Sequence, residues 1–499
     1  MPTLVRIFSK ECGASPRQVS RAACFPPDRI AEVSRWLEAG HGIIAAGTGW
    51  AWEPKTPGQT MANDAAINRI IGKSGLYWAG RSPTPRNGGY QVSGVRVSPC
   101  LNASRALAEF RQLAGNDNAT RLSLTDKKQC GITLAGVPSL VASSDPMTAE
   151  LMDLVRSRFG KVIPTRDAPV KMDDMLAAVT VALENRWLLQ LPPEKMPAHP
   201  AAKAFPGLPT PEAKPSGPVE VVIDPAVPQW TGTGLYALPG QVIRLETAAP
   251  DLLGKFVVRI GCHTDELWGL DEWQRSPQIT TATALEKPVT AAANPFGGPV
   301  FIEVPEKCAL TKPVSLRISG AIPMPRFVLG KTTPDEWQHQ RLLPAPWAEL
   351  AGHKLALCVP AEFIRKLDDP APLMEFWDKV VTADETLAAW QSGDRTSPER
   401  IVPDVQISAG YMHSGYPIMT GDDVYATMVD VAEMRKDKLP SCRHGGRAIF
   451  PDRERFLSSA EGKPKSGRHR LRPWAALPPA PPVWCLLTPI SLGLPAVWP

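Results

Sequence analysis

The spacing of apolar residues changes its period near residue 218. Before that point, apolar side chains recur three or four positions apart. This spacing predicts helices at residues 30–37, 64–74, 103–113, 148–159 and 172–189. A short apolar run at residues 42–46 predicts a buried strand that leads into a Gly-Thr-Gly turn. Together these elements predict an α/β domain over residues 1–190.

After residue 218 the period becomes two. Short segments rich in Val and Ile alternate with Gly/Pro turns at 219–224, 241–248, 254–262, 299–305 and 314–320. This pattern predicts a β-sandwich over residues 219–325. Residues 326–439 are mixed, with strands expected at 353–359 and 404–418 and helices expected at 360–367 and 372–390. We therefore expect a multidomain chain that combines α/β, all-β and α+β parts.

Proline adds two boundaries to this picture. The chain has 54 prolines in 499 residues, about twice the average usage. Nine of them lie in residues 191–218, which predicts a semi-rigid linker because proline sustains neither helix nor sheet interior. Residues 440–499 form a basic, Pro/Arg-rich tail. Their abrupt onset is typical of out-of-frame translation of GC-rich DNA or of a natural disordered tail.

The charge distribution argues against nucleic acid as a partner. The net charge is +5, but the last sixty residues hold nine basic and three acidic side chains, a net of +6. The other 439 residues hold 46 basic and 47 acidic side chains, a net of −1, and so provide no basic field for nucleic acid. No apolar run reaches the roughly 18 residues of a membrane span. No export signal is visible at the start of the chain.

Two parts of the sequence resemble known proteins. The run GHGIIAAGTGWAWEPKTPGQTMANDAAINRIIGKSGLYWAG resembles the amidotransferase-like domain of some enhancin-like peptidases and of TRP-channel-associated factors. The runs QWTGTGLYALPGQVIRLE, NPFGGPVFIEVP and DVQISAGYMHSGYPIMT resemble the enhancin-like, mucin-directed zinc metallopeptidases of family M60. The resemblance implies a flavodoxin- or amidotransferase-like N-terminal domain, then a sandwich, then a zincin-like α+β peptidase domain. It also implies an extracellular or periplasmic location and a mucin-type glycoprotein or glycan as partner.

The zinc motif of that family is absent from the sequence. The chemistry requires a helix with HExxH, in which two histidines bind zinc and the glutamate polarises the bound water. None of the eight histidines is followed by glutamate, and no two are four residues apart. In the family this helix follows the Gly-Tyr-Pro strand, where this sequence changes into its tail. We therefore expect residues 326–439 to be an incomplete peptidase domain that binds no zinc and is catalytically inactive as given, unlike intact relatives.

The resemblance places the strand at 404–418 beside the active site. It makes Tyr411, His413, Ser414 and Tyr416 candidates for a substrate cleft. His413 either points into that cleft or forms a hydrogen bond at a strand end, and the sequence leaves both interpretations open.

Three tryptophans are candidates for glycan binding, since aromatic faces stack on sugars. Trp50 and Trp52 follow the Gly-Thr-Gly turn and have the alternative role of core residues. Thr48 occupies the place of an amidotransferase nucleophile, but a structural turn explains it better because no cysteine or histidine base is paired with it. Trp268 is the third candidate. It is surrounded by acidic residues that indicate either a cation or glycan site or a solvated loop: Asp265, Glu266, Asp271 and Glu272.

Taken together, the sequence predicts an M60 metallopeptidase-related protein directed at mucin-type glycoproteins and inactive as given. The alternatives are a non-catalytic module that binds a glycan or protein, and an interaction module similar to the channel-associated factors.

Overall fold

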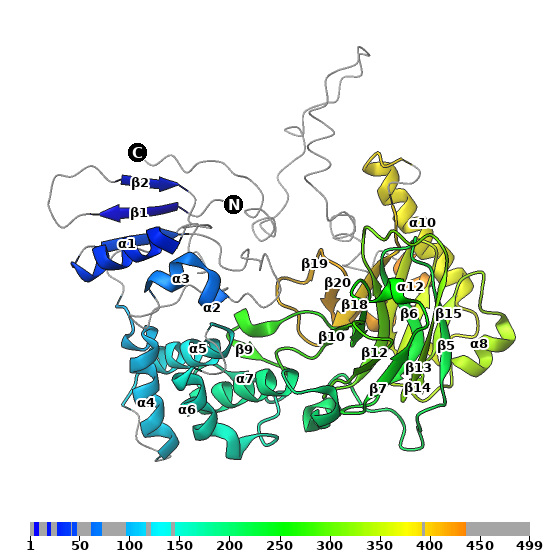
Figure 1. The fold of residues 1–499 in the computed structure, drawn as a ribbon. Coiled ribbons are helices and arrows are strands. Elements are labelled where there is room, and N and C mark those ends of the chain that lie inside the picture. The colour runs from blue at the N-terminus through cyan, green and yellow to red at the C-terminus, as the bar shows by residue number, and fades with distance from the viewer. Residues whose placement is uncertain are drawn as a thin grey trace, which may run out of the picture.

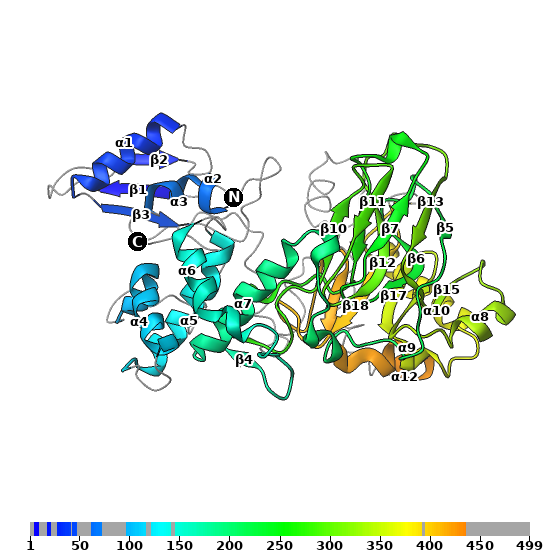
Figure 2. The same cartoon turned by 60° about the horizontal axis from the view of Figure 1, so that its bottom comes forward.

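The structure is a computed structural model that describes residues 4–8, 17–20, 27–40, 42–46, 61–71, 96–115, 121–140, 145–391 and 395–435. Small N-terminal elements and a group of helices lie at one end of the molecule, and two β-rich parts lie at the other (Figures 1 and 2). The expected tail at 440–499 lies outside the described residues. No helix in the described part has both the length and the apolar character needed to cross a bilayer.

The N-terminal elements are a three-stranded sheet and short helices. The strands pair antiparallel in the order β2-β1-β3, and the elements are β1 Leu4–Phe8, β2 Arg17–Ser20, α1 Pro27–Glu38, β3 Gly42–Ala46, α2 Met61–Asp64 and α3 Ala66–Ile71. The expected first helix and strand are confirmed, whereas the helix expected at 64–74 is two short ones. The three described strands are all antiparallel, so they do not confirm the parallel sheet of a flavodoxin-like domain.

The described residues between 96 and 190 form a helical region, whereas the sequence predicted an α/β domain over residues 1–190. Its elements are η3 Pro99–Leu101, α4 Ala103–Gly115, α5 Leu124–Leu140, α6 Pro146–Val155, η4 Arg156–Arg158, β4 Val170–Lys171 and α7 Met175–Leu189. The Asp145 side chain caps α6 by accepting a hydrogen bond from the Met147 amide at 2.9 Å, as its position before the helix predicts. Residues such as Phe110, Leu134 and Leu151 form the buried core of the region.

Helix α5 was not expected from the sequence. Its residues LTDKKQCGITLAGVPSL have no clear apolar stripe, because the helix is contacted on several sides by α4, α7 and the turn at η3. A helix that packs on several sides loses the periodic signal on which its prediction depends. Gly131 also lies against the backbone of Met172, so an added Cβ would meet the Met172 carbonyl oxygen at 1.9 Å.

The proline-rich segment 191–218 has no α-helix or β-strand, but it is packed against the rest of the chain instead of spanning a gap. It contains the short turns η5 Pro193–Lys195 and η6 Pro200–Lys203. Ala201, Ala202 and Phe205 are buried, and the indole of Trp347 donates to the Pro206 carbonyl at 2.8 Å. The spacer interpretation is therefore wrong for the buried part of this segment, while the domain boundaries stay predictions.

Residues 219–323 form two sheets that enclose an apolar core. One sheet has the order β10-β8-β12-β6-β14 and the other β11-β7-β13-β5. The strands are β5 Val219–Ile223, β6 Gln229–Ala237, β7 Ile243–Glu246, β8 Val257–Ile260, β10 Thr281–Ala284, β11 Val289–Ala292, β12 Gly298–Val304, β13 Val314–Ser319 and β14 Ile322–Pro323. Alternate residues such as Ile223, Val258 and Ile302 point into the shared core. This period of two is what the sequence predicted.

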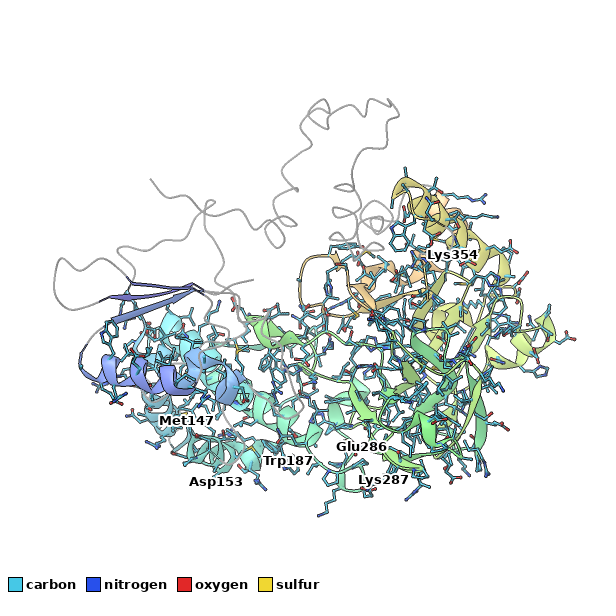
Figure 3. All side chains as sticks on the ribbon, turned by 45° about the horizontal axis from the view of Figure 1, so that its top comes forward. Met147, Asp153, Trp187, Glu286, Lys287 and Lys354 are labelled. Atoms are coloured by element: carbon cyan, nitrogen blue, oxygen red, sulfur yellow. The ribbon has the colours of Figure 1, made fainter. Side chains whose placement is uncertain are left out.

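The C-terminal part is a six-stranded mixed sheet with the order β15-β16-β17-β18-β20-β19. We call it the peptidase sheet after the peptidase domain that the sequence resemblance predicts at residues 326–439. Its strands are β15 Arg326–Val328, β16 Trp347–Ala351, β17 Leu355–Pro360, β18 Glu399–Asp404, β19 Met412–His413 and β20 Ile418–Gly421. The helices are α8 Pro334–Gln340, α9 Ala361–Ile364, α10 Ala371–Leu387, α11 Tyr425–Met428 and α12 Val431–Arg435. Helix α10 packs on the sheet through Met374 and Trp377. Lys354, which is labelled in Figure 3, pairs with Glu385 of that helix.

Candidate functional site

The candidate site is the edge loop, which we define as residues 405–417 between β18 and β20. It contains β19, the last strand of the peptidase sheet, which pairs with β20. Residues 409, 410, 414 and 415 at its tips are exposed, whereas residues 405–408 are half-buried. The edge loop therefore presents an exposed tip on a partly buried base.

The strand expected at 404–418 is not continuous, so that expectation is wrong. The Asp404 carboxylate accepts a hydrogen bond from the Gln406 amide at 3.1 Å, which turns the chain as soon as β18 ends. Gly410 has a φ of 64° and Gly415 a φ of 149°, which a strand of L-residues does not adopt. Between these bends, Met412 and His413 keep strand pairing. The apolar and aromatic alternation predicted a strand, but the glycines divide it.

Both ring nitrogens of His413 face hydrogen-bond acceptors. Nε2 lies 2.8 Å from an Asp265 carboxylate oxygen, and Nδ1 lies 3.1 Å from the Ser414 carbonyl oxygen. A histidine that meets both acceptors needs a proton on each nitrogen, so this geometry favours the imidazolium. Burial acts to lower the pKa of His413, but the hydrogen bond and negative charge of Asp265 outweigh burial and raise it. Of the two open interpretations, hydrogen bonding at a strand end describes His413.

The arrangement of Ser408, His413 and Asp265 differs from a catalytic triad. The Ser408 hydroxyl lies 3.3 Å from Nε2, the same nitrogen that contacts Asp265. In a triad the carboxylate and the serine engage opposite nitrogens, so that the free one can accept the serine proton. Here Nε2 is committed to the carboxylate. His413 therefore carries a positive charge and fixes the position of the edge loop, and it is not arranged to act as a general base.

Asp265 belongs to a second segment, the docking loop, which we define as residues 262–278. Its side chain is 8% exposed and is not part of a solvated acidic loop, which corrects that interpretation for this residue. Glu266 and Asp271 are exposed, as a solvated loop predicts. Burial acts to raise the pKa of Asp265, but bonds from His413 and Ser408 outweigh it and lower the pKa below its ordinary value.

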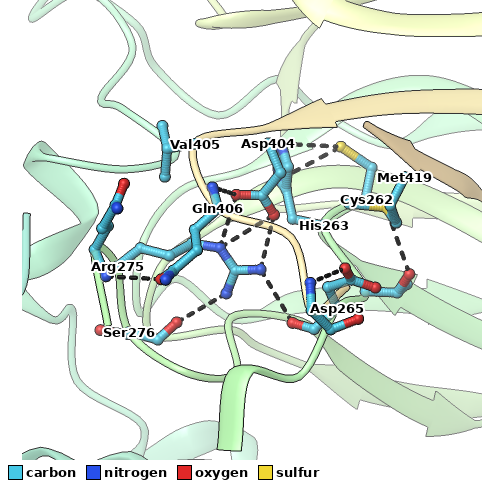
Figure 4. Close-up of polar contacts among 12 residues, drawn as sticks. Cys262, His263, Asp265, Arg275, Ser276, Asp404, Val405, Gln406 and Met419 are labelled. Atoms are coloured by element: carbon cyan, nitrogen blue, oxygen red, sulfur yellow. Dashed lines mark hydrogen bonds and ion pairs between the residues drawn. The ribbon is translucent and has the colours of Figure 1, made fainter. Parts of the chain in front are cut away.

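A buried ion pair joins the docking loop to the peptidase sheet. The Arg275 guanidinium donates from Nε and Nη2 to the Asp404 carboxylate at 2.8 and 2.7 Å, and both side chains are at most 1% exposed (Figure 4). Arg275 also donates to the backbone carbonyls of Ser276 and Asp265. Gln406 adds a bridge, because its side-chain amide accepts from the Gln274 amide and donates to the Glu272 carbonyl. These contacts fix the base of the edge loop.

The docking loop also holds the helical region. Its short strand β9, Glu272–Trp273, pairs antiparallel with β4. Trp273 is 1% exposed and packs beside Val170 and Leu267. Arg166, from the same region, pairs with Asp422 at the end of β20 and donates to the Val405 carbonyl at 3.2 Å. The helical region therefore contacts the docking loop through β4 and the edge loop through Arg166.

The other expected cleft residues do not gather at one point. The Tyr411 hydroxyl donates to Asp423 at 3.1 Å, and burial followed by the charge of Asp423 raises its pKa to about 12. Ser414 is exposed at the tip. Tyr416 is directed toward the sandwich, where its ring meets Trp230 edge-on with centroids 5.5 Å apart. Tyr411 and Tyr416 thus engage Asp423 and Trp230, while His413 contacts the backbone carbonyl of the adjacent Ser414.

Of the three glycan candidates, one can be placed. The Arg186 guanidinium lies over the Trp268 ring, 4.9 Å from its centroid, and Trp273 meets the ring edge-on. A sugar stacking on that face would have to displace Arg186. Trp50 and Trp52, together with Thr48, lie outside the described residues. Glycan binding by these residues stays a prediction.

A buried charge cluster that was not predicted from the sequence lies at the joint between the sandwich and the peptidase sheet. Glu349 of β16 is 1% exposed and pairs with Arg400 at 2.8 Å and Arg326 at 2.7 Å. A Cβ at Gly232 of β6 would lie 1.8 Å from the Glu349 carboxylate. A charged residue inside the apolar run WAELA, and glycines inside the strand QWTGTGLYA, were the available signals.

No group of three or more His, Cys, Asp or Glu side chains with the arrangement of a metal site occurs in the described part of the chain. The donors at the edge loop do not fit zinc either. His413 is committed to Asp265 and Ser414 through both nitrogens, and a zinc ligand needs one nitrogen free of a proton.

Two family models match consecutive parts of this chain. Residues 213–319 match the N-terminal domain of M60-like peptidases, and residues 320–438 match Peptidase M60, enhancin and enhancin-like. The chain is a member of the enhancin-like M60 family. The matched residues form the sandwich and the peptidase sheet. The docking loop lies in the first match and the edge loop lies in the second.

Several relatives of this M60 family member are TRPM8 channel-associated factors. Factor 1 from Bos taurus is 31% identical over 437 residues, which is 83% of this chain and 46% of that protein. Factor 3 from Rattus norvegicus is 41% identical over 194 residues, which is 38% of this chain and 21% of that protein. The chain therefore spans about half the length of the first of these relatives.

Solved M60 peptidases are more distant. The IMPa metallopeptidase from Pseudomonas aeruginosa aligns with 60% of this chain and 39% of its own, at 16% sequence identity and a TM-score of 0.40. The ZmpB metallopeptidase from Clostridium perfringens aligns with 41% of this chain and 45% of its own, at 16% identity and a TM-score of 0.33. Likeness at this level supports no conclusion about activity.

Proposed function

We propose that this chain is an M60-type protein that binds mucin-type glycoproteins through its edge loop and does not cleave them. The observation that carries the proposal is the edge loop itself, which is exposed at its tip and held at its base by Asp265 and by the pair of Arg275 and Asp404. An edge strand that is already held in place can pair with an extended peptide at a low cost in conformational entropy.

The choice of ligand follows the resemblance to mucin-directed peptidases. Mucin-type segments carry dense O-linked sugars and stay extended, which suits pairing along an edge strand. The exposed Ser414 would then lie beside the peptide backbone, and Tyr411 would lie beside its sugars. Tyr416 supports the loop from the sandwich side.

The sequence supports the proposed lack of cleavage. No HExxH occurs in the 499 residues, and His413 is placed to hold the loop rather than to polarise water. The residues of the edge loop therefore supply recognition without a general base.

A second candidate function is binding to another protein in the manner of an interaction module. It is favoured by the 31% identity to a TRPM8 channel-associated factor over 83% of this chain. The same edge loop would then pair with a protein segment that carries no sugar.

Two further expectations belong to this proposal. An extracellular or periplasmic location follows from the mucin-type ligand, and fractionation of cells with an antibody to the chain tests it. An amidotransferase-like fold for the N-terminal domain follows from the sequence resemblance, and an experimental structure of that domain tests it.

Binding to immobilised O-glycosylated mucin, measured by biolayer interferometry, tests the proposed function. We expect binding by the wild type, no new mucin fragments, and a loss of about tenfold in affinity, or about 1.4 kcal/mol, for Ser414→Arg. Val222→Arg is the matched control, since it places the same side chain at an exposed site on the outer face of the sandwich. Equal binding to enzymatically deglycosylated mucin would favour the second candidate. No binding to either form would refute both for this ligand.

A further inference from the structure

One carboxylate oxygen holds both arms of the edge loop. Oδ2 of Asp265 accepts a hydrogen bond from the Ser408 amide at 2.6 Å, where the loop leaves β18. The same oxygen lies 2.8 Å from Nε2 of His413, where the loop returns toward β20. Asp265 itself belongs to the docking loop, which is anchored by Arg275 and by the pairing of β9 with β4. A single side chain outside the edge loop therefore sets the separation of its two arms.

We propose that Asp265 is the residue that positions the edge loop for its ligand, and that it does so while His413 carries two protons. This inference rests on the proposed function only where it refers to a ligand. The positioning of the edge loop by Asp265 involves residues of this chain alone. The hydrogen bonds that the Asp265 side chain makes in the described part of the chain go to Ser408 and His413 and not to Ser414 at the exposed tip. It acts through His413 and Ser408, so it is a positioning residue.

The charges around His413 identify Asp265 as its electrostatic partner. From the docking loop, Asp265 faces the ring, and the nearby Arg275 is already paired with Asp404. From the edge loop, the ring meets the neutral Ser408 hydroxyl and the Ser414 carbonyl. From β20, Met419 pairs with His413 through the backbone and carries no charge. Loss of one proton from His413 would thus remove the positive charge that faces Asp265.

The direction of the pH dependence follows from the two shifts. The pKa of His413 is raised above 6.5, so its contribution is complete below pH 6.5 and is lost as pH rises through the raised value. The pKa of Asp265 is lowered below 3.8, so its contribution is complete above pH 3.8 and is lost as pH falls through the lowered value. The charge-assisted contact between His413 and Asp265 should therefore be complete between pH 3.8 and 6.5 and weaken as pH rises through the raised pKa of His413, while the bond from the Ser408 amide to Asp265 remains.

Amide hydrogen exchange of the full chain tests the inference without any ligand. At pH 6 we expect exchange within residues 405–417, corrected for intrinsic rates, to be about tenfold faster in Asp265→Asn than in the wild type. The difference should shrink as pH rises through the pKa of His413. Asp251→Asn is the control, because Asp251 is an exposed carboxylate on the sandwich. Equal protection of the loop in Asp265→Asn and wild type at pH 6 would overturn the inference.

A second measurement covers the case in which Asp265→Asn does not fold. The ring resonances of His413 in the wild type, assigned with His413→Gln, should titrate above 6.5 in an NMR pH series. A value at or below 6.5 would overturn the inference. Faster exchange in Asp265→Asn combined with no mucin binding by the wild type supports the positioning role and refutes the proposed ligand, so the two failures are distinguishable.

Discussion

Replacing Gly232 with alanine should be among the most damaging small substitutions in this chain. The new Cβ would lie 1.8 Å from Oε2 of Glu349 and 2.5 Å from its carboxyl carbon. The carboxylate would have to leave, which breaks its pairs with Arg400 and Arg326 in a site that is 1% exposed at Glu349. Loss of one partner from a buried ion pair costs about 3–5 kcal/mol because the remaining charge stays desolvated. That is a large share of the roughly 5–15 kcal/mol that stabilises a folded protein.

Equilibrium urea unfolding followed by tryptophan fluorescence measures this loss, since Trp230 lies against Arg400. Gly217→Ala is the matched control, because a Cβ there meets nothing within 4 Å, and it should change the free energy of unfolding by less than about 1 kcal/mol. In a Glu349→Ala background, Gly232→Ala should cost little, because the group it collides with is gone. A full additional cost in that background, or a wild-type midpoint for Gly232→Ala alone, would refute the reasoning.

Three other predictions concern separate parts of the molecule. Burial lowers the pKa of His263 to about 4, so stability should fall by up to about 3 kcal/mol between pH 6.5 and 4, and the fall should be smaller in His263→Gln when urea midpoints are compared. Trp273→Ala removes a residue that is 1% exposed at the junction of β9 and β4. It should cost about 3–5 kcal/mol and make the docking loop sensitive to limited proteolysis. The purified chain should hold no stoichiometric zinc by elemental analysis, and EDTA should leave mucin binding unchanged; one zinc per chain would contradict this.

The sequence predicted the elements whose packing preserves a clear period. Strands β5, β8 and β13 bury alternate residues against one core, so a period of two is visible in the sequence. The sequence pattern did not predict strand β6, because Gly232 and Gly234 interrupt the alternation of apolar and polar residues. The same two glycines leave room for Glu349 and Arg326. The glycines that make room for these charged side chains therefore interrupt the alternating pattern that would have predicted the strand.

The candidate site was located from the sequence only in part. The run YMHSGYP pointed to His413 and Ser414, which the structure places together at the edge loop. Asp265 could not be assigned to them, because it lies 148 residues earlier and has acidic neighbours that resemble a solvated loop. Only the fold brings the two segments into contact, and a single sequence contains no information on which aspartate pairs with which histidine.

The pairing of β4 with β9 also orders events during synthesis. The helical region has its own core and can close once α7 has left the ribosome, but Val170 waits for Trp273, which follows about 100 residues later. At about 5–20 residues per second, that delay is on the order of 5–20 s. During this time the apolar cluster that contains Met172, Ala178 and Val181 lacks Leu267 and Trp273, which the docking loop supplies. The nascent chain is therefore prone to aggregation and to chaperone binding in that interval, which ends when the docking loop emerges.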